Sequence, residues 1–150
     1  MDNRITEIIT RRMNLDGFWI TTNSIKSNYD GKWSNCLYLH FPKESFPFLN
    51  LPKLIKNDSE LFTSFKKRFD YLDTELNKLP FHGGITFYEE IYNLETENTY
   101  VKVGCDYQHL YDDEYRLNDN GELILKNDGI YLANSFIQLI KSHENKDSIK

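Results

Sequence analysis

Residues 84–107 of this chain read GITFYEEIYNLETENTYVKVGCDY. The segments 84–93 and 99–107 are rich in aromatic and β-branched residues, a composition that is typical of strands. The polar residues 95–98 (ETEN) lie between them and suit a tight connection. The sequence therefore predicts a β-hairpin over residues 84–107.

The second strand of this hairpin has two distinct faces, because successive side chains of a strand point in opposite directions. The apolar face is expected to carry Val101, Val103 and Cys105. The other face would carry Lys102, with Tyr100 and Gly104 on either side of it. Burial of a thiol in apolar surroundings raises its pKa and makes it unreactive, so we do not expect Cys105 to act as a nucleophile.

Three other segments have apolar residues at steps of three and four, a spacing that predicts amphipathic helices. These segments are 3–13, 58–78 and 129–143. Further strands are predicted at 18–22 and 36–41, and a short one at 122–125 after the turn signal Asn118-Asp119-Asn120-Gly121. Hairpin-linked strands with helices at both ends and in the middle indicate the α+β class rather than a doubly wound fold.

The chain has 150 residues, a length that corresponds to one domain. We therefore expect a single α+β domain over residues 1–150, with an antiparallel or mixed sheet packed by an N-terminal, a central and a C-terminal helix. Residues 1–16 would form the N-terminal helix and its turn, and residues 144–150 would form a frayed tail.

The composition narrows the function classes. The net charge is −5, from 18 Lys and Arg against 23 Asp and Glu, which argues against direct binding of DNA or RNA. The cysteines Cys36 and Cys105 are too few for a disulfide scaffold and lack the spacing of a metal site. No signal peptide or apolar run of roughly 18 residues is present, so we expect a cytoplasmic protein that does not contact a membrane.

The candidate site begins at His82, which directly precedes Gly83 and Gly84. Glycine permits positive φ and lets a ligand approach the main chain closely, but the same residues also suit a tight turn. If the predicted hairpin forms, antiparallel pairing brings the end of its second strand, with Asp106 and His109, back to His82. Two imidazoles and a carboxylate would then converge.

This set of residues suits more than one chemistry. Imidazole and carboxylate groups can hold a divalent metal ion, although no HxH or HxxxH spacing supports this. Alternatively, His82 and His109 could act as acid and base while Asp106 orients one ring. A third interpretation is a hydrogen-bond network with no function of its own. Asp112 and Asp113 are further carboxylates whose membership of the site is open.

Aromatic side chains near polar segments could stack on a planar ring such as a nucleobase, although stacking within a core is their commoner role. They are Trp19, Tyr29, Trp33, Tyr38, Phe46, Phe48, Phe87, Tyr88, Tyr107 and Tyr111. The isolated cations that could meet a phosphate are Lys26, Lys32, Lys43, Lys102 and Arg116. Lys102 is the most informative of these because it shares a strand face with Tyr100 and Gly104.

These motifs resemble those of a group of small bacteriophage and prophage proteins. Such proteins carry His-Gly-Gly-(Leu/Ile)-Thr-(Phe/Tyr) and then Gly-Phe-Asp-Cys-Ala-His-x-Gly-Asp. Residues 82–87 (HGGITF) match the first pattern, and residues 104–109 (GCDYQH) match part of the second. The same proteins often carry an upstream segment of the type aromatic-Val-x-Val-Pro-x-x-His-Pro, and residues 38–47 (YLHFPKESFP) look like a divergent form of it. The histidine near the end of that segment is replaced here around Ser45-Phe46. The final Gly-Asp is not reproduced, since Asp112 and Asp113 follow Leu110-Tyr111.

The resemblance implies a site at this segment and a small phage accessory protein. The leading hypothesis is a counter-defence protein that binds a nucleotide-like signal of a bacterial immune system. Its ligand-binding residues would be His82, Gly83, Gly84, Thr86, Lys102, Asp106 and His109. One alternative is a hydrolase or phosphodiesterase that uses His82, His109 and Asp106, with or without a divalent metal. Another is a protein-binding inhibitor of a host defence enzyme that uses the acidic residues 112–114.

Overall fold

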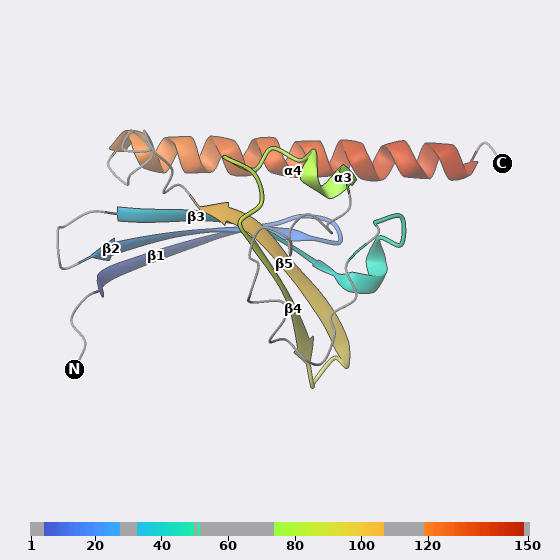
Figure 1. Cartoon of the computed structure of the whole chain (residues 1–150), viewed down its shortest axis with the longest axis horizontal. Helices are drawn as coiled ribbons and strands as arrows, with labels where there is room; N and C mark the ends of the chain where they lie inside the picture. Colours follow the sequence, from blue (N-terminus) through green and yellow to red (C-terminus); the bar gives the residue numbers. More distant parts are fainter. Residues whose placement is uncertain (1–4, 28–32, 50, 52–73, 107–118, 149–150) are drawn as a thin grey trace.

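The structure is a computed structural model that describes residues 5–27, 33–49, 51, 74–106 and 119–148. The described strands form one antiparallel sheet in the order β1-β2-β3-β5-β4. They are β1 (Ile5–Asn14), β2 (Trp19–Ser27), β3 (Trp33–Pro42), β4 (Phe87–Asn93) and β5 (Asn98–Asp106). The helical elements are the 3-10 turn η1 (Lys43–Ser45), the short α3 (Thr74–Asn77) and the long α4 (Asp119–Ser148). Helix α4 lies across one face of the sheet (Figure 1).

The central strand β3 shows how the sequence divides the sheet into two faces. Leu37, Leu39 and Phe41 are completely buried, whereas the residues between them are only half-buried. This alternation follows from the two-residue period of a strand with one face against the core. Because β2 and β5 both pair with β3, the same division extends across the middle of the sheet.

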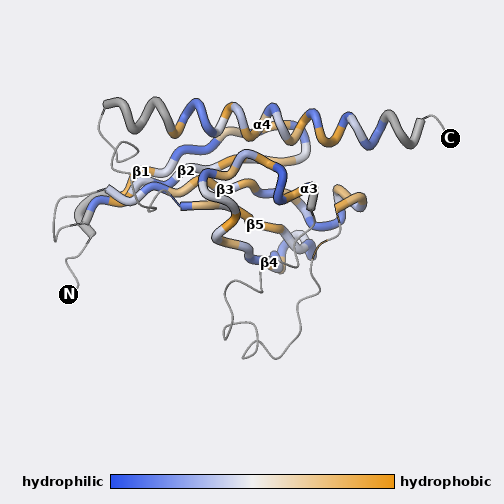
Figure 2. The backbone as a smooth tube through the Cα atoms, turned by 45° about the horizontal axis from the view of Figure 1, so that its top comes forward, coloured by the Kyte–Doolittle hydropathy of each residue, from blue (hydrophilic) through white to orange (hydrophobic). Residues whose placement is uncertain are grey.

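Helix α4 closes the core through a stripe of apolar and small residues. Phe136 is fully buried and contacts the rings of Phe18 and Phe41, at centroid distances of 4.9 and 5.7 Å. Gly129 lies three residues before Leu132, and a Cβ atom placed on it would lie 3.8 Å from Cγ2 of Ile20 on β2. Helix and sheet therefore approach closely there. Figure 2 shows apolar and polar residues alternating along α4, as expected for a helix with one buried side.

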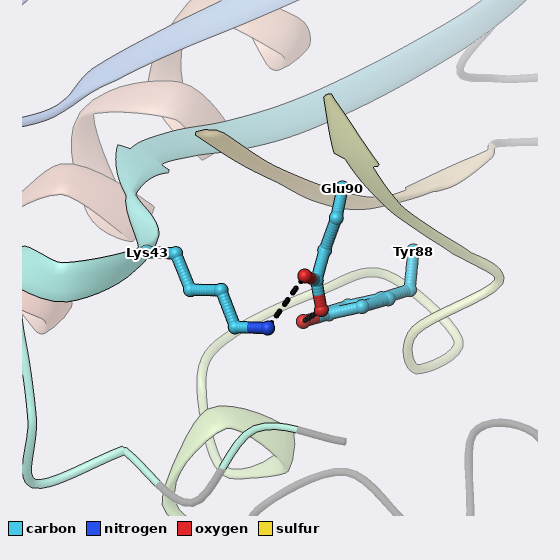
Figure 3. Close-up of polar contacts among 3 residues, drawn as sticks. All are labelled: Lys43, Tyr88 and Glu90. Carbon is cyan, nitrogen blue, oxygen red and sulfur yellow. Dashed lines mark hydrogen bonds and ion pairs between the residues drawn. The ribbon is translucent and has the colours of Figure 1, made fainter. Parts of the chain in front are cut away.

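A polar cluster on the α4 side of the sheet joins η1 to β4 (Figure 3). The ammonium group of Lys43 lies 2.6 Å from the Glu90 carboxylate, and the Tyr88 hydroxyl donates to the other carboxylate oxygen at 2.9 Å. The Glu90 side chain is only 8% exposed, so these two contacts replace part of its solvation by water. The cluster fixes the start of the chain after β3 against the edge strand.

The expected hairpin is confirmed. Strand β4 pairs with β5 from Phe87 opposite Gly104 to Asn93 opposite Asn98. Val101, Val103 and Cys105 are buried, on the face predicted for them. The predicted strands at 18–22 and 36–41 fall within β2 and β3.

The expected packing of the sheet by N-terminal, central and C-terminal helices is wrong. The N-terminal helix at 3–13 is replaced by β1, which pairs with β2 from Ile5 opposite Ser27 to Asn14 opposite Trp19. An isolated helix of this length is marginal, and sheet pairing satisfies the same main-chain groups. Of the central helix at 58–78, residues 74–77 form α3, and residues 58–73 lie outside the described ranges.

The third correction concerns the last helix. Helix α4 begins at Asp119 rather than near residue 129, so residues 122–125 are helical and do not form the predicted strand. Residues 119–121 of the predicted turn are helical too, and Asn118 lies outside the described residues. Leu125 is buried on the same helix side as Leu132, and this packing outweighs the local turn signal. The helix also continues to Ser148, into the residues that were expected to fray.

Candidate functional site

The face of the sheet opposite α4 carries a continuous set of rings. We name it the aromatic face and define it as Trp19, Tyr38, His40, Phe87 and Tyr100. These rings come from the neighbouring strands β2, β3, β4 and β5, and all are half-buried. No helix in the described part of the chain lies on this side of the sheet (Figure 1).

The centre of the aromatic face is a stacked pair. The imidazole of His40 lies parallel to the indole of Trp19, with a centroid distance of 5.2 Å and an interplanar angle of 8°. The two residues are direct partners in the β2–β3 register. A hydrogen bond of 2.7 Å joins His40 Nε2 to Thr21 Oγ1, and Tyr100 contacts the indole at 5.7 Å. These contacts fix the orientation of the imidazole.

Tyr38 and Phe87 form a second group on this face. Their rings meet edge to face at 5.4 Å, and both residues are register partners of Gly104 on the strand between them. A Cβ atom at Gly104 would lie 2.1 Å from the carbonyl oxygen of Leu37 and 2.6 Å from the Tyr38 ring. The close approach of β3 to β5 beneath these rings therefore requires glycine.

Two cations lie against the rings. The Arg12 guanidinium carbon is 4.7 Å from the centroid of the Trp19 ring, and Arg12 Nε donates to Asn14 Oδ1 at 2.6 Å. Lys102 Nζ is 4.3 Å from the centroid of Tyr38 and 5.2 Å from that of Phe87. These distances are those of cation–π contacts, which hold the charges over the face.

The charges act on His40. Burial lowers the pKa of its imidazole most, and the positive charges of Lys102 and Arg12 lower it further, to about 4. His40 is therefore neutral at pH 7, with two positive charges close to it. Two carboxylates share this side of the sheet, Glu89 opposite Lys102 and Asp106 at the end of β5. Burial of the Tyr38 hydroxyl is the largest cause of its raised pKa. The hydrogen bond with Cys36 and the charge of Asp106 raise the pKa of Tyr38 further.

The predicted site around His82 forms a turn that is tied to the end of β5. Gly83 and Gly84 have φ values of 72° and 90°, which only glycine adopts readily. Thr86 N–H donates to the Gly104 carbonyl at 2.9 Å, and Asp106 N–H donates to Thr86 Oγ1 at 3.2 Å. The hairpin thus brings Thr86, two residues after Gly84, next to Asp106.

Cys105 belongs to the core rather than to a site. It is 1% exposed, and burial raises the pKa of its thiol to about 12, against the smaller opposing effect of a main-chain hydrogen bond from His82. The structure therefore confirms that Cys105 lies on the buried face. A thiol with this pKa is protonated at pH 7 and is a poor nucleophile.

Other predicted residues are placed differently or lie outside the described ranges. Lys102 lies over two rings of the aromatic face, Tyr38 and Phe87, and is four residues from Asp106 along β5. His109, Asp112 and Asp113 lie outside the described residues, as does the acidic segment 112–114. The convergence of His82 with His109 therefore stays a prediction.

Neither a candidate metal cluster nor a membrane-spanning helix occurs among the residues that the structure describes. No group of three or more His, Cys, Asp and Glu side chains in these ranges is placed to hold a metal ion. Within the same ranges, no helix has the length and apolar character needed to cross a membrane.

Sequence reasoning placed Tyr100 on the same strand face as Lys102 but missed Arg12 and His40 as parts of this surface. Alternation along β3 places His40 on the same face as Tyr38, which was a usable signal. No family model matches the sequence, and no curated protein or solved structure matches the chain. The chemistry of the chain's own residues therefore carries the functional argument.

Proposed function

We propose that this protein binds an anionic, nucleotide-like small molecule on its aromatic face. The observation that carries the proposal is that two cations lie over rings on either side of His40, Arg12 over Trp19 at 4.7 Å and Lys102 over Tyr38 at 4.3 Å. A negative group bound there would be attracted to both cations. Since the chain has a net charge of −5, this positive region is a local feature rather than part of a basic surface.

The rings support an aromatic ligand as well as a charged one. The edges of aromatic rings are electropositive and their faces are negative, so rings that meet edge to face present both to a planar base. Base–aromatic stacking contributes about 1–3 kcal/mol per base in nucleic-acid-binding proteins. Phosphate would be bound by the cations, and a base or sugar would contact Trp19, His40 or Tyr38.

The biological setting that we propose follows from the resemblance to phage proteins. A protein of this kind would act in the cytoplasm of the host cell and sequester a nucleotide signal of a bacterial immune system. An acidic protein with a small positive site suits this role, because it would bind a small anion without binding nucleic acids in general. Recognition of a single small ligand needs only one or two cations.

Calorimetry with a panel of cyclic dinucleotides, cyclic mononucleotides and ADP-ribose tests the proposal. We expect at least one of them to bind and Lys102→Ala to weaken it about tenfold, the effect of losing one charge-assisted contact. Lys78→Ala is the matched control, because Lys78 is an exposed lysine beyond α3. Absence of binding by every compound, or equal affinity of wild type and Lys102→Ala, would contradict the proposal.

A second proposal is a hydrolase that uses His82, Asp106 and His109. It is supported by the main-chain hydrogen bond from Asp106 to Thr86, which holds the glycine turn beside the end of β5. Chromatography of a bound nucleotide after incubation tests it. Conversion by wild type that is lost in His82→Ala is expected, whereas recovery of the unchanged nucleotide would exclude this role for that compound.

A further inference from the structure

The two cations beside the aromatic face lie on different strands, on either side of the Trp19–His40 pair. Arg12 is on β1 and Lys102 is on β5, and strands β2 and β3 lie between them. Three strand spacings of about 4.8 Å separate the two backbones by about 14 Å. Each side chain is held by its own ring, Arg12 over Trp19 and Lys102 over Tyr38. The two charges are therefore on the order of 10 Å apart.

One phosphate group cannot contact both charges directly at this separation, because hydrogen bonds to its oxygens are about 2.9 Å long. We propose that the ligand carries two phosphate groups separated by a nucleoside unit, one bound at Arg12 and the other at Lys102. A linear dinucleotide and a cyclic dinucleotide both have this chemistry. This inference depends on the proposed nucleotide binding and adds the number and spacing of the charged groups.

The region between the cations suits the part of the ligand that joins the phosphates. Trp19 and His40 lie there, stacked on each other, and the imidazole is neutral at pH 7. An uncharged surface of ring edges can contact a sugar or base without removing charges from water.

Carboxylates on the same side of the sheet define the direction of the ligand. Glu89 lies opposite Lys102 on the edge strand β4, and Asp106 lies further along β5. Both would repel a phosphate that extended beyond Lys102 toward β4 or toward the end of β5. The ligand is therefore expected to run from Lys102 across β3 and β2 to Arg12.

Arg12 is able to bind a phosphate because its hydrogen bond to Asn14 uses only one of its five N–H donors. Arg12 Nε donates to Asn14 Oδ1, which leaves the guanidinium plane oriented while its terminal nitrogens carry four more N–H groups. The Arg12 side chain is exposed. Its neighbour Arg11 projects to the opposite side of β1 and provides a matched control.

Calorimetry with three probes tests the inference: a 5′-phosphorylated dinucleotide, a cyclic dinucleotide and a nucleoside monophosphate. Each is titrated into wild type, Arg12→Ala, Lys102→Ala, the double variant and Arg11→Ala. We expect each single loss on the aromatic face to weaken a two-phosphate probe about tenfold, and the double loss about 100-fold. Arg11→Ala should bind as wild type does, and the monophosphate should bind more weakly.

The outcomes separate this inference from the proposed function. This pattern with either two-phosphate probe supports the inference. The probe that binds with the higher affinity shows whether the ligand is a linear or a cyclic dinucleotide. If Lys102→Ala weakens binding but Arg12→Ala does not, the two-phosphate inference is overturned while nucleotide binding stands. The same holds if the monophosphate binds as tightly as the dinucleotides. If no probe binds, both proposals fail.

Discussion

His40 on β3 stacks in parallel on Trp19 of β2, with ring centroids 5.2 Å apart. The pair lies on the side of the sheet that α4 does not cover, and two cations approach it from β1 and β5. Protonation of this imidazole is opposed mainly by its burial and also by both cations. This relationship connects the stability of the sheet to the proposed binding of anions.

The stability of the protein should depend on pH through His40. The imidazole has a pKa of 6.5 in its ordinary state and about 4 in the folded chain, so the unfolded state binds more protons between these values. The free energy of unfolding should therefore fall as the pH is lowered from 6.5 to 4. We expect His40 to contribute about 1–3 kcal/mol to this fall, after allowance for partial exposure of the ring.

Denaturant unfolding at a series of pH values measures this effect. The variant His40→Gln cannot titrate, so its free energy of unfolding should change less than that of wild type between pH 6.5 and 4. Identical pH dependence of the two proteins would show that His40 is not the responsible group.

Substitution of two glycines by alanine should change the stability of the protein in opposite directions. Gly104→Ala places a methyl group 2.1 Å from the Leu37 carbonyl oxygen, so β3 and β5 must separate, at an expected cost of about 1–3 kcal/mol. Gly129→Ala adds a methyl group at 3.8 Å from Ile20 Cγ2, within helix α4. Ordinary contact and higher helix propensity should stabilise the protein by about 0.5–1 kcal/mol.

Thermal or denaturant unfolding of both variants checks these signs. A Gly104→Ala protein as stable as wild type would show that the close approach of β3 to β5 is not needed. A loss of stability in Gly129→Ala would show that helix and sheet are closer there than the contact distance indicates.

The cluster at Glu90 should be important for stability. Lys43→Ala removes the counter-charge of a carboxylate whose side chain is 8% exposed, and we expect a loss of about 1–3 kcal/mol. Lys141→Ala is the control, because Lys141 is exposed on α4 and its loss should change stability by less than about 0.5 kcal/mol. Equal unfolding free energies of the two variants would mean that the ion pair adds nothing to its surroundings.

Cys105 should not react with thiol reagents while the protein is folded. Burial raises the pKa of its thiol to about 12, and 1% of the residue is exposed. A Cys36→Ser variant isolates this thiol, and labelling with an aromatic disulfide reagent at pH 8 should be slow until denaturant is added. Rapid labelling of the native variant would contradict the placement of Cys105 in the core.

The hairpin was predictable because its information is local. The polar residues 95–98 lie between two segments of strand composition, and pairing of these neighbours fixes which residues of β5 face the core. β1 was not predictable in the same way. Its isoleucines fit a helical spacing, and the decision depends on pairing with β2. The turn signal at Asn118–Gly121 likewise gives way to the packing of the long helix on the sheet.

The contact between the segment after the glycine turn and the end of β5 was predictable for the same reason. Asp106 N–H donates to Thr86 Oγ1 because the pairing of β4 with β5 brings the start of one strand to the end of the other. The aromatic face depends on β3 pairing with β5, across a connection of more than fifty residues that local patterns do not describe. Arg12 was missed because a helix at 3–13 would not have placed its side chain on a sheet face.

The most direct test of anion binding on the aromatic face is the pKa of His40, measured by NMR with and without a saturating nucleotide. Burial is the largest cause of the low pKa of His40 and remains when the nucleotide is bound, whereas negative charge beside Arg12 and Lys102 offsets the smaller effect of these cations. The account therefore predicts that the pKa of His40 rises above about 4 on binding but stays below 6.5. A nucleotide that binds while the pKa of His40 stays unchanged would contradict the account.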